Sequence, residues 1–272
     1  MSGPRVAIVQ FPGVNCESES VHALALAGLD GEVFRWTRPA RELAAFDAFV
    51  LPGGFAWQDR VRAGALAARD PLVDALAAQA ERGRPVLGIC NGAQVLVEAG
   101  LVPGGGAVEL ALARNRMPDR DGYQSRWVTC RVEEGPCVFT RHLAPGTLLP
   151  LPVAHGEGRF TSAREGFVDE LLSLGQVPLR YADATGAPAA AFPDNPNGSA
   201  AAAAAVCNPR GNVLAMMPHP ERVLDLGAIA RGIGGAWGAR RDEALARGGG
   251  DVHAPAPGRA LFAGLAAHLQ EA

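Results

Sequence analysis

Hydrophobic and polar positions in the first hundred residues alternate between short apolar runs and longer segments with helical spacing. Short β-branched runs indicate strands, and Ala- and Leu-rich segments indicate helices between them. The expected strands are residues 5–11, 32–36, 46–51 and 85–89, and the expected helices are 18–28, 65–82 and 93–99. Regular alternation of this kind predicts an α/β fold, with a mostly parallel central sheet flanked by helices.

The pattern changes after about residue 105, where runs become shorter. Residues 125–132 are typical of an antiparallel strand, 164–174 of a helix, and 213–217 of a buried strand that ends at a proline. The alanine run 200–205 favours a helix by propensity. We instead predict a strand continuing to residue 207, because residues 208–212 have the composition of a hairpin turn.

The C-terminal part contains a segment unlike the rest. Residues 238–258 are rich in Gly, Arg and Pro, which predicts a flexible surface excursion. Residues 259–270 show helical spacing of apolar positions and predict a last helix. No internal repeat is apparent, so we expect one domain over residues 1–272.

Composition excludes several classes of function. The net charge of −3 offers no basic surface for nucleic acid or an anionic membrane. No apolar run approaches the roughly 20 residues of a membrane span. The N-terminus lacks a signal-peptide pattern, so we expect a cytoplasmic protein. All 25 basic residues are Arg, which excludes mechanisms that need a Schiff-base or P-loop lysine.

The five cysteines are widely scattered, and none forms a Cys-x-x-Cys pair. The sequence therefore indicates neither a disulfide framework nor a zinc site.

The segment 88–92, Gly-Ile-Cys-Asn-Gly, joins a predicted strand to a predicted helix. Glycines two positions before and after a nucleophile permit the cramped turn that presents its side chain at a helix start. We expect the Cys90 thiol to be exposed near a helix N-terminus, where the thiolate is favoured. The alternative is a small buried cysteine beside a glycine turn, the usual environment of a free cysteine.

A thiol nucleophile needs a base, and the base needs an orienting group. His219-Pro220-Glu221 follows a predicted buried strand and supplies both. In an extended segment, positions i and i+2 point the same way, so Glu221 is expected beside the imidazole of His219. The alternative is a loop that closes the strand.

Stabilisation of a tetrahedral intermediate needs hydrogen-bond donors. Gly53-Gly54 follows a predicted strand, and Asn91 follows the nucleophile. The backbone amides of Gly54 and Asn91 are candidate oxyanion donors, each worth roughly 3 kcal/mol of barrier. An ordinary turn is the alternative for the glycine pair.

These motifs, in this order, resemble those of class I (triad) glutamine amidotransferases. Within that class the chain is similar to the glutaminase subunits of phosphoribosylformylglycinamidine synthases of purine biosynthesis. The similarity covers roughly residues 5–225, and its motifs are residues 51–55, 88–94, 126–128, 154–160, 195–199 and 216–222. Residues 55–60 and 114–125 depart from the family pattern. The resemblance implies a flavodoxin-like fold with an antiparallel addition.

The resemblance also implies an activity. Cys90, His219 and Glu221 would form the catalytic triad that hydrolyses glutamine through a thioester, and Gln94 is a tentative substrate contact. His155 and Glu157 would lie near the site entrance or a partner interface. Ammonia would pass to a large synthetase subunit, assisted by a small accessory subunit. ATP and Mg²⁺ would be used by that partner, and no metal or organic cofactor is implied for this chain.

Two other classes of function remain open at this point. The first is another class I amidotransferase or a cysteine hydrolase of related fold, although such hydrolases usually lack a His-Pro-Glu so late in the chain. The second is a non-catalytic regulatory module, against which retention of all three triad residues argues.

Overall fold

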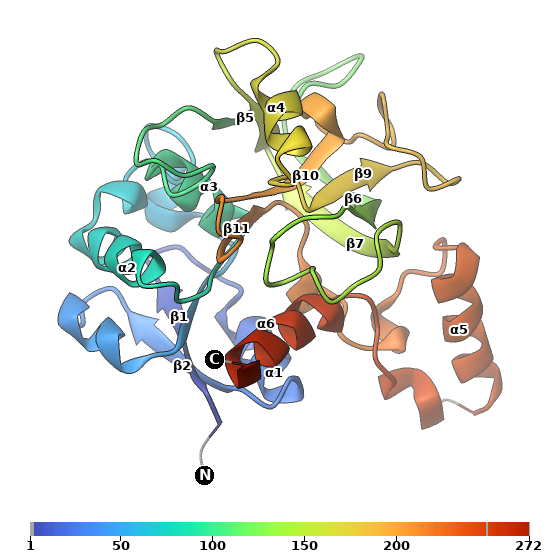
Figure 1. Ribbon diagram of the computed structural model, residues 1–272. Helices are drawn as coiled ribbons and strands as arrows, with labels where there is room; N and C mark the ends of the chain where they lie inside the picture. Colours follow the sequence, from blue (N-terminus) through green and yellow to red (C-terminus); the bar gives the residue numbers. More distant parts are fainter. Residues whose placement is uncertain (1–2, 249, 272) are drawn as a thin grey trace.

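The computed structural model describes residues 3–248 and 250–271, which are organised around one large sheet (Figure 1). Its strands are β1 (Arg5–Gln10), β2 (Asp30–Arg35), β3 (Ala48–Leu51), β4 (Val86–Ile89), β6 (Gln124–Val132), β7 (Leu148–His155), β9 (Leu179–Ala182), β10 (Ala203–Cys207) and β11 (Val213–Met216). Their order is β2-β1-β3-β4-β11-β10-β9-β6-β7.

Half of this sheet is parallel. Strands β2, β1, β3, β4 and β11 are neighbours that run in one direction. Every residue of β3, β4 and β11 is buried, which explains why these strands read as continuous apolar runs rather than alternating ones. The predicted parallel α/β sheet is confirmed.

The other half is antiparallel, as the shorter runs after residue 105 predict. Strands β10, β9, β6 and β7 continue from β11 with alternating direction. A separate two-stranded sheet pairs β5 (Ala111–Arg114) with β8 (Glu157–Thr161). Strand β8 begins two residues after β7 ends, so this small sheet stands beside the end of β7.

Helices cover both faces of the parallel strands. The helices of the chain are α1 (Glu17–Leu26), α2 (Pro71–Glu81), α3 (Asn91–Glu98), α4 (Phe167–Ser173), α5 (Gly235–Ala246) and α6 (Arg259–Glu271), of which α4 and α5 lie beside the antiparallel half instead. Figure 1 shows α2 and α3 on one side of these strands, and α1 with the adjacent α6 on the other. Among the described residues, no helix is long and apolar enough to span a membrane.

Short 3₁₀ turns link many of these elements. They span Ala40–Ala45, Ala56–Asp59, Ala67–Arg69, Ala200–Ala202, Pro220–Arg222, Leu226–Ala228 and Gly250–His253.

The helix predicted over 65–82 is wrong at its start. Helix α2 begins at Pro71, and the Asp70 carboxylate accepts a hydrogen bond from the Leu72 amide at 2.9 Å. An N-cap aspartate followed by proline at the first helical position is a strong helix start, so the Ala-rich residues before it do not join the helix.

The strand predicted over 200–207 is confirmed only from Ala203 onward. Residues Ala200–Ala202 form a 3₁₀ turn in which Ala201 has a left-handed backbone, with φ of 51°. Tertiary context, not alanine propensity, decides this segment, because β10 pairs with β11 and β9 on its two sides.

The flexible excursion predicted over 238–258 is wrong for residues 238–246 and 250–253, and Gly249 lies outside the described residues. Helix α5 runs to Ala246, and Gly250–His253 forms a 3₁₀ turn. The helix is held to the body, since Trp237 Nε1 donates to the Leu148 carbonyl at 3.0 Å. Arg241 is 4% exposed and donates to the Ile233 carbonyl at 3.2 Å, so composition alone misrepresents this segment.

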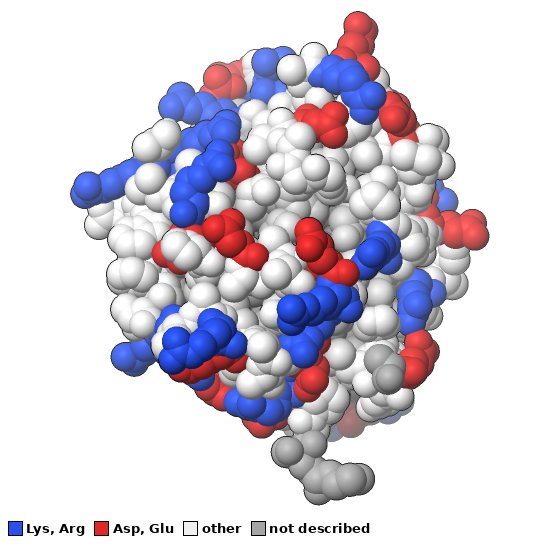
Figure 2. Space-filling model, turned by 60° about the vertical axis from the view of Figure 1, so that its left-hand side comes forward, with Lys and Arg blue, Asp and Glu red and all other residues white. Residues whose placement is uncertain are grey.

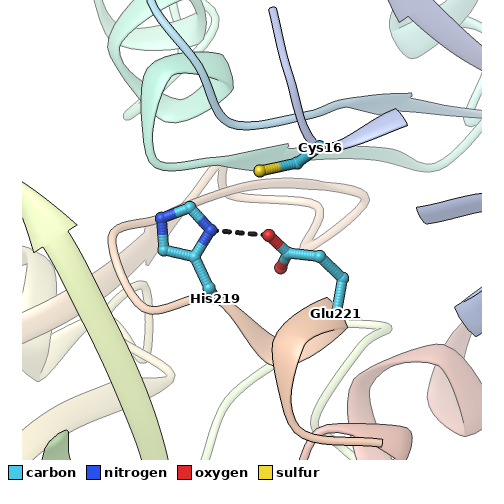
Figure 3. A group of neighbouring side chains, drawn as sticks. All are labelled: Cys16, His219 and Glu221. Carbon is cyan, nitrogen blue, oxygen red and sulfur yellow. Dashed lines mark hydrogen bonds and ion pairs between the residues drawn. The ribbon is translucent and has the colours of Figure 1, made fainter. Parts of the chain in front are cut away.

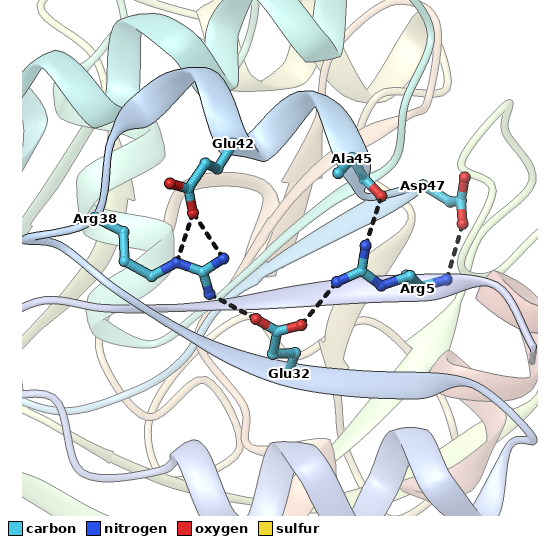
Figure 4. Close-up of polar contacts among 6 residues, drawn as sticks. All are labelled: Arg5, Glu32, Arg38, Glu42, Ala45 and Asp47. Atoms are coloured by element: carbon cyan, nitrogen blue, oxygen red, sulfur yellow. Dashed lines mark hydrogen bonds and ion pairs between the residues drawn. The ribbon is translucent and has the colours of Figure 1, made fainter.

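Charges on the surface are mixed in sign. Figure 2 shows basic and acidic side chains interspersed on one face. At the β1–β2 edge, the Glu32 carboxylate forms ion pairs with Arg5 at 2.8 Å and with Arg38 at 2.5 Å. Arg38 also forms an ion pair with Glu42 at 2.9 Å (Figure 4). These side chains are partly exposed, so each pair contributes about 0–1 kcal/mol.

Candidate active site

Cys90 stands at the turn between β4 and α3. Its backbone has φ of 50° and ψ of −103°, a conformation that L-residues rarely adopt. The Cys90 amide donates to the Met216 carbonyl at 2.8 Å, which ties the end of β4 to the end of β11. The strand–turn–helix predicted for this segment is present.

The two glycines of this turn are required by close packing. A Cβ on Gly88 would lie 2.7 Å from the Gly92 carbonyl oxygen. A Cβ on Gly92 would lie only 1.9 Å from the Leu51 carbonyl oxygen. The start of α3 therefore presses directly on β3, and larger residues would push the nucleophile out of place.

Cys90 is less exposed than its sequence context predicts. Only 6% of the residue is accessible, because the end of β7 passes over it. Its Sγ lies 3.5 Å from the Ala154 carbonyl oxygen. The thiol nevertheless reaches a pocket, described below, so burial here shields a reacting group from bulk water.

His219 and Glu221 form a buried pair just beyond β11. Nδ1 of His219 lies 2.5 Å from Oε1 of Glu221, and both residues are 2% exposed (Figure 3). The predicted contact is present, but its geometric basis is different. Pro220–Arg222 is a 3₁₀ turn, so the two side chains meet across a tight turn rather than on one face of an extended strand.

The charge state of His219 reflects this partner. Burial lowers the pKa of His219, whereas the Glu221 carboxylate and the nearby Cys90 and Cys16 raise it, and the net direction is well above the ordinary value. The imidazolium is thus favoured. Nε2 of His219 has no hydrogen-bond partner within the described part of the chain. Thiol–imidazole contacts in resting enzymes are often loose in this way.

Cys16 makes a third buried group near this pair. Its Sγ and the ligand atoms of His219 and Glu221 all lie within 4.8 Å of one another (Figure 3). The arrangement fits a metal poorly, because the Arg222 guanidinium donates to Sγ at 3.1 Å and the His–Glu hydrogen bond occupies Nδ1 of His219 and Oε1 of Glu221. We treat these residues as a hydrogen-bonded cluster.

The candidate oxyanion donors lie where the sequence places them. Gly54 follows β3, lines the same pocket as Cys90, and has φ of 147°. A Cβ there would lie 2.5 Å from Cα of Val14, so this strand end is closely packed. Asn91 is the first residue of α3, and the first amides of a helix have no partner within it. Their role as oxyanion donors stays a prediction.

A pocket of about 170 Å³ opens over the nucleophile. It is formed by strand ends and two loops, and its walls are Gly54, Phe55, Asp59, Ala63, Cys90, Gln94, Tyr123, Ala154, His155, Gly156 and Glu157. Its volume suits a molecule of amino-acid size. The loop over 55–63 that forms one wall includes left-handed backbone at Trp57, Gln58, Asp59 and Val61.

The pocket has an acidic end. Burial, then the charge of Glu157, raise the pKa of Asp59 to about 6, although a hydrogen bond from Asn91 lowers it. Nδ2 of Asn91 lies 3.2 Å from Oδ1 of Asp59. A bound cation at this end of the pocket would offset the repulsion that Glu157 exerts on the Asp59 carboxylate.

Gln94 lies in the pocket wall rather than free in the pocket. Its Nε2 donates to the Glu157 carbonyl at 2.6 Å, and its Oε1 accepts from Asn91 Nδ2 at 2.9 Å. Asn91 Oδ1 in turn accepts from the Ala56 amide at 2.9 Å. These bonds join α3 to β8 and to the loop after β3, so Gln94 shapes the pocket, and its contact with substrate stays a prediction.

Sequence reasoning missed some residues of the site and misplaced another. Asp59 and Tyr123 line the pocket, but they fall in segments 55–60 and 114–125, which depart from the family pattern. His155 was expected near the site entrance or a partner interface, and the structure places it deeper, 2% exposed and lining the pocket beside Cys90. Its position in the chain could have indicated this place, because His155 ends a strand at the catalytic edge of the sheet.

The comparisons with known proteins agree with this geometry. Residues 3–236 match the model of the CobB/CobQ-like glutamine amidotransferase domain. The phosphoribosylformylglycinamidine synthase subunit PurQ of Methanothrix thermoacetophila is 41% identical over 274 residues, with 98% of each chain covered. The chain belongs to the PurQ family of glutamine amidotransferases.

Other PurQ relatives have similar coverage. The PurQ subunit of Thermomicrobium roseum is 46% identical over 237 residues, covering 87% of this chain and 92% of that protein. The structure of PurLQS from Thermotoga maritima superposes with a TM-score of 0.72 at 28% identity, covering 98% and 99% of the two chains. The PurQ fold therefore extends over nearly the whole chain, including the antiparallel half.

Proposed function

We propose that this chain is the glutaminase subunit of a phosphoribosylformylglycinamidine synthase. It hydrolyses glutamine to glutamate and delivers ammonia for synthesis of formylglycinamidine ribonucleotide. One observation carries the chemistry: a strained cysteine at a helix N-terminus lies beside a buried His–Glu pair just beyond the next parallel strand, β11.

The chemistry follows from the positions of three side chains. Cys90 Sγ attacks the side-chain carboxamide carbon, and the amides of Gly54 and Asn91 stabilise the oxyanion. His219 takes the thiol proton and gives it to the leaving nitrogen, so the C–N bond breaks and a thioester forms. Water then cleaves the thioester with His219 as base. Glu221 keeps the imidazole oriented and stabilises its charged form.

The pocket supports glutamine as the substrate. Its volume of about 170 Å³ suits a single amino acid. Asp59 and Glu157 offer negative charge at the wall where the α-ammonium group would lie, while Cys90 stands where the side-chain amide would end. Glutamine has an α-ammonium group for the acidic wall and a neutral side-chain carboxamide for Cys90.

The proposal places ATP and Mg²⁺ in partner subunits, not in this chain. A large synthetase subunit activates formylglycinamide ribonucleotide, and a small accessory subunit completes the complex. The PurLQS neighbour supports this assembly. The proposal needs no metal or organic cofactor bound to this chain, and a cytoplasmic location stays a prediction.

The covalent intermediate tests the proposed residues. The assembled complex, quenched with acid during glutamine turnover, is expected to carry a γ-glutamyl adduct on the peptide that contains Cys90. Mass spectrometry of the digested chain locates it. An adduct on Cys16 instead, or turnover without any adduct in a thioester-trapping quench, would contradict Cys90 as the nucleophile.

A further inference from the structure

His155 ends strand β7 inside the candidate active site. The preceding residue, Ala154, places its carbonyl 3.5 Å from Cys90 Sγ, and His155 itself lines the same pocket. Its ring packs closely against Gly158, where a Cβ would be 2.2 Å from Cε1 of the ring. Glycine at position 158 therefore allows the imidazole to occupy this place, and the ring cannot turn freely.

The hydrogen bonds of Asn115 determine which ring nitrogen carries the proton. Nδ2 of Asn115 donates to the carbonyls of Gly122 at 2.9 Å and His155 at 2.7 Å. Oδ1 is thus the acceptor end, and it receives the Gly158 amide at 3.0 Å. Nδ1 of His155 lies 3.0 Å from the same oxygen, so Nδ1 must be the donor.

The other nitrogen, Nε2, therefore carries a lone pair. Burial, and then the charge of His219, lower the pKa of His155 to about 3, so the ring is neutral at physiological pH. Nε2 is buried and has no hydrogen-bond partner in residues 3–248 and 250–271. A buried acceptor without a partner is costly, which indicates that a ligand supplies the missing donor.

Resting on the proposed function, we propose that Nε2 of His155 accepts a hydrogen bond from the side-chain amide nitrogen of glutamine and holds that nitrogen as it leaves. The substrate carbonyl oxygen needs donors, which the oxyanion amides provide. The amide nitrogen carries two N–H groups and needs an acceptor. Within the pocket wall, neutral His155 supplies an acceptor whose geometry is fixed by Asn115 and Gly158.

The interaction strengthens during the reaction. As Cys90 attacks, the amide nitrogen loses its resonance with the carbonyl and is protonated by His219. Its N–H groups then become stronger donors, because hydrogen bonds to charged groups are worth more than neutral ones. His155 therefore stabilises the transition state more than the ground state, which raises kcat rather than only lowering KM.

Comparison of two substrates separates this role from a structural one. Glutamine and the γ-methyl ester of glutamate share the attacked carbonyl, but the ester has no N–H on its leaving group. In the assembled complex, His155→Leu is expected to lower kcat/KM for glutamine by about ten- to hundredfold. For the ester the same change is expected to cost less than about threefold. Equal partial losses of activity with both substrates, or no loss with glutamine, would overturn the proposal.

A second variant guards against misfolding of the first. His155→Gln keeps an amide oxygen able to accept a hydrogen bond and is expected to recover part of the glutamine turnover lost in His155→Leu. If His155→Leu loses both activities, His155→Gln decides: an equal loss with both substrates counts against the proposal. If the wild-type complex releases no glutamate from glutamine, the proposed function itself is refuted. That result differs from failure of the His155 proposal, in which His155→Leu leaves the ratio of glutamine to ester activity unchanged.

Discussion

The ring of His219 lies against the bare Cα of Gly53. A Cβ at position 53 would be 2.7 Å from Cε1 of His219 and 3.4 Å from Sγ of Cys16. Gly53, just after β3, thus helps to set the position of the His219 imidazole. This packing role is separate from the role proposed for Gly54.

Gly53→Ala tests this contact. The added methyl group must displace the imidazole, and a small displacement of a reacting group costs about tenfold to a hundredfold in rate. We expect kcat for glutamate release to fall by at least about tenfold. Gly232→Ala is the matched control, because a Cβ there meets nothing within 4 Å. Full activity in Gly53→Ala would show that the base is not held by this contact.

The Glu221 carboxylate is expected to maintain the charge of His219. Glu221→Gln keeps the shape but removes a group that raises the pKa of His219, so that pKa should fall. We expect glutaminase activity to drop by roughly a hundredfold or more, as for orienting carboxylates in other triads. Titration of the His219 Cε1–H signal by NMR, assigned with His219→Asn, measures the shift. An unchanged or higher pKa contradicts the assignment.

Asp59 makes glutamine binding depend on pH. Its pKa is raised to about 6, so its negative charge is lost as the pH falls through that value. If the carboxylate holds the α-ammonium group, KM for glutamine rises below about pH 6 while kcat changes less. Asp59→Asn should show a high KM for glutamine at every pH, without the further rise below about pH 6. If KM for glutamine depends on pH in Asp59→Asn as it does in the wild type, Asp59 does not bind the substrate.

Replacement of Gly92 is expected to lower the stability of the fold as well as the activity. A Cβ 1.9 Å from the Leu51 carbonyl forces α3 away from β3. Overpacking of this kind costs about 1–3 kcal/mol. Gly92→Ala should lower Tm by several degrees, measured by differential scanning fluorimetry beside Gly232→Ala. A Tm equal to that of the control would mean that the backbone shifts without cost.

The parallel half of the fold and the triad candidates were accessible from the sequence. Buried parallel strands give continuous apolar runs, and Cys90 and His219 each follow such a run directly. Because carboxyl ends of parallel neighbours meet at one edge, strand order alone brings Gly54, Cys90 and His219 together. The His219–Glu221 contact was anticipated from residue spacing, but the 3₁₀ turn that makes it depends on Pro220 and the fold around it.

The remaining parts depend on contacts that no local pattern encodes. Helix α5 is anchored by Trp237, which donates to the distant Leu148 carbonyl, while its composition is that of a loop. The ring orientation of His155 and the nitrogen that carries its proton are set by Asn115, forty positions away. The carboxyl pair of Asp59 and Glu157 is likewise assembled across distant segments.

The central claim is that Cys90 drives glutamine hydrolysis in a synthetase complex. The most direct measurement is glutamate release from glutamine by wild type, Cys90→Ala and the buried-thiol control Cys130→Ala. Each is assayed alone and with the synthetase subunits, formylglycinamide ribonucleotide and ATP. We predict activity that rises sharply with the partners, is retained in Cys130→Ala and is absent in Cys90→Ala. Glutamate release that persists in Cys90→Ala, or none from wild type in a complex active on free ammonia, would contradict the claim.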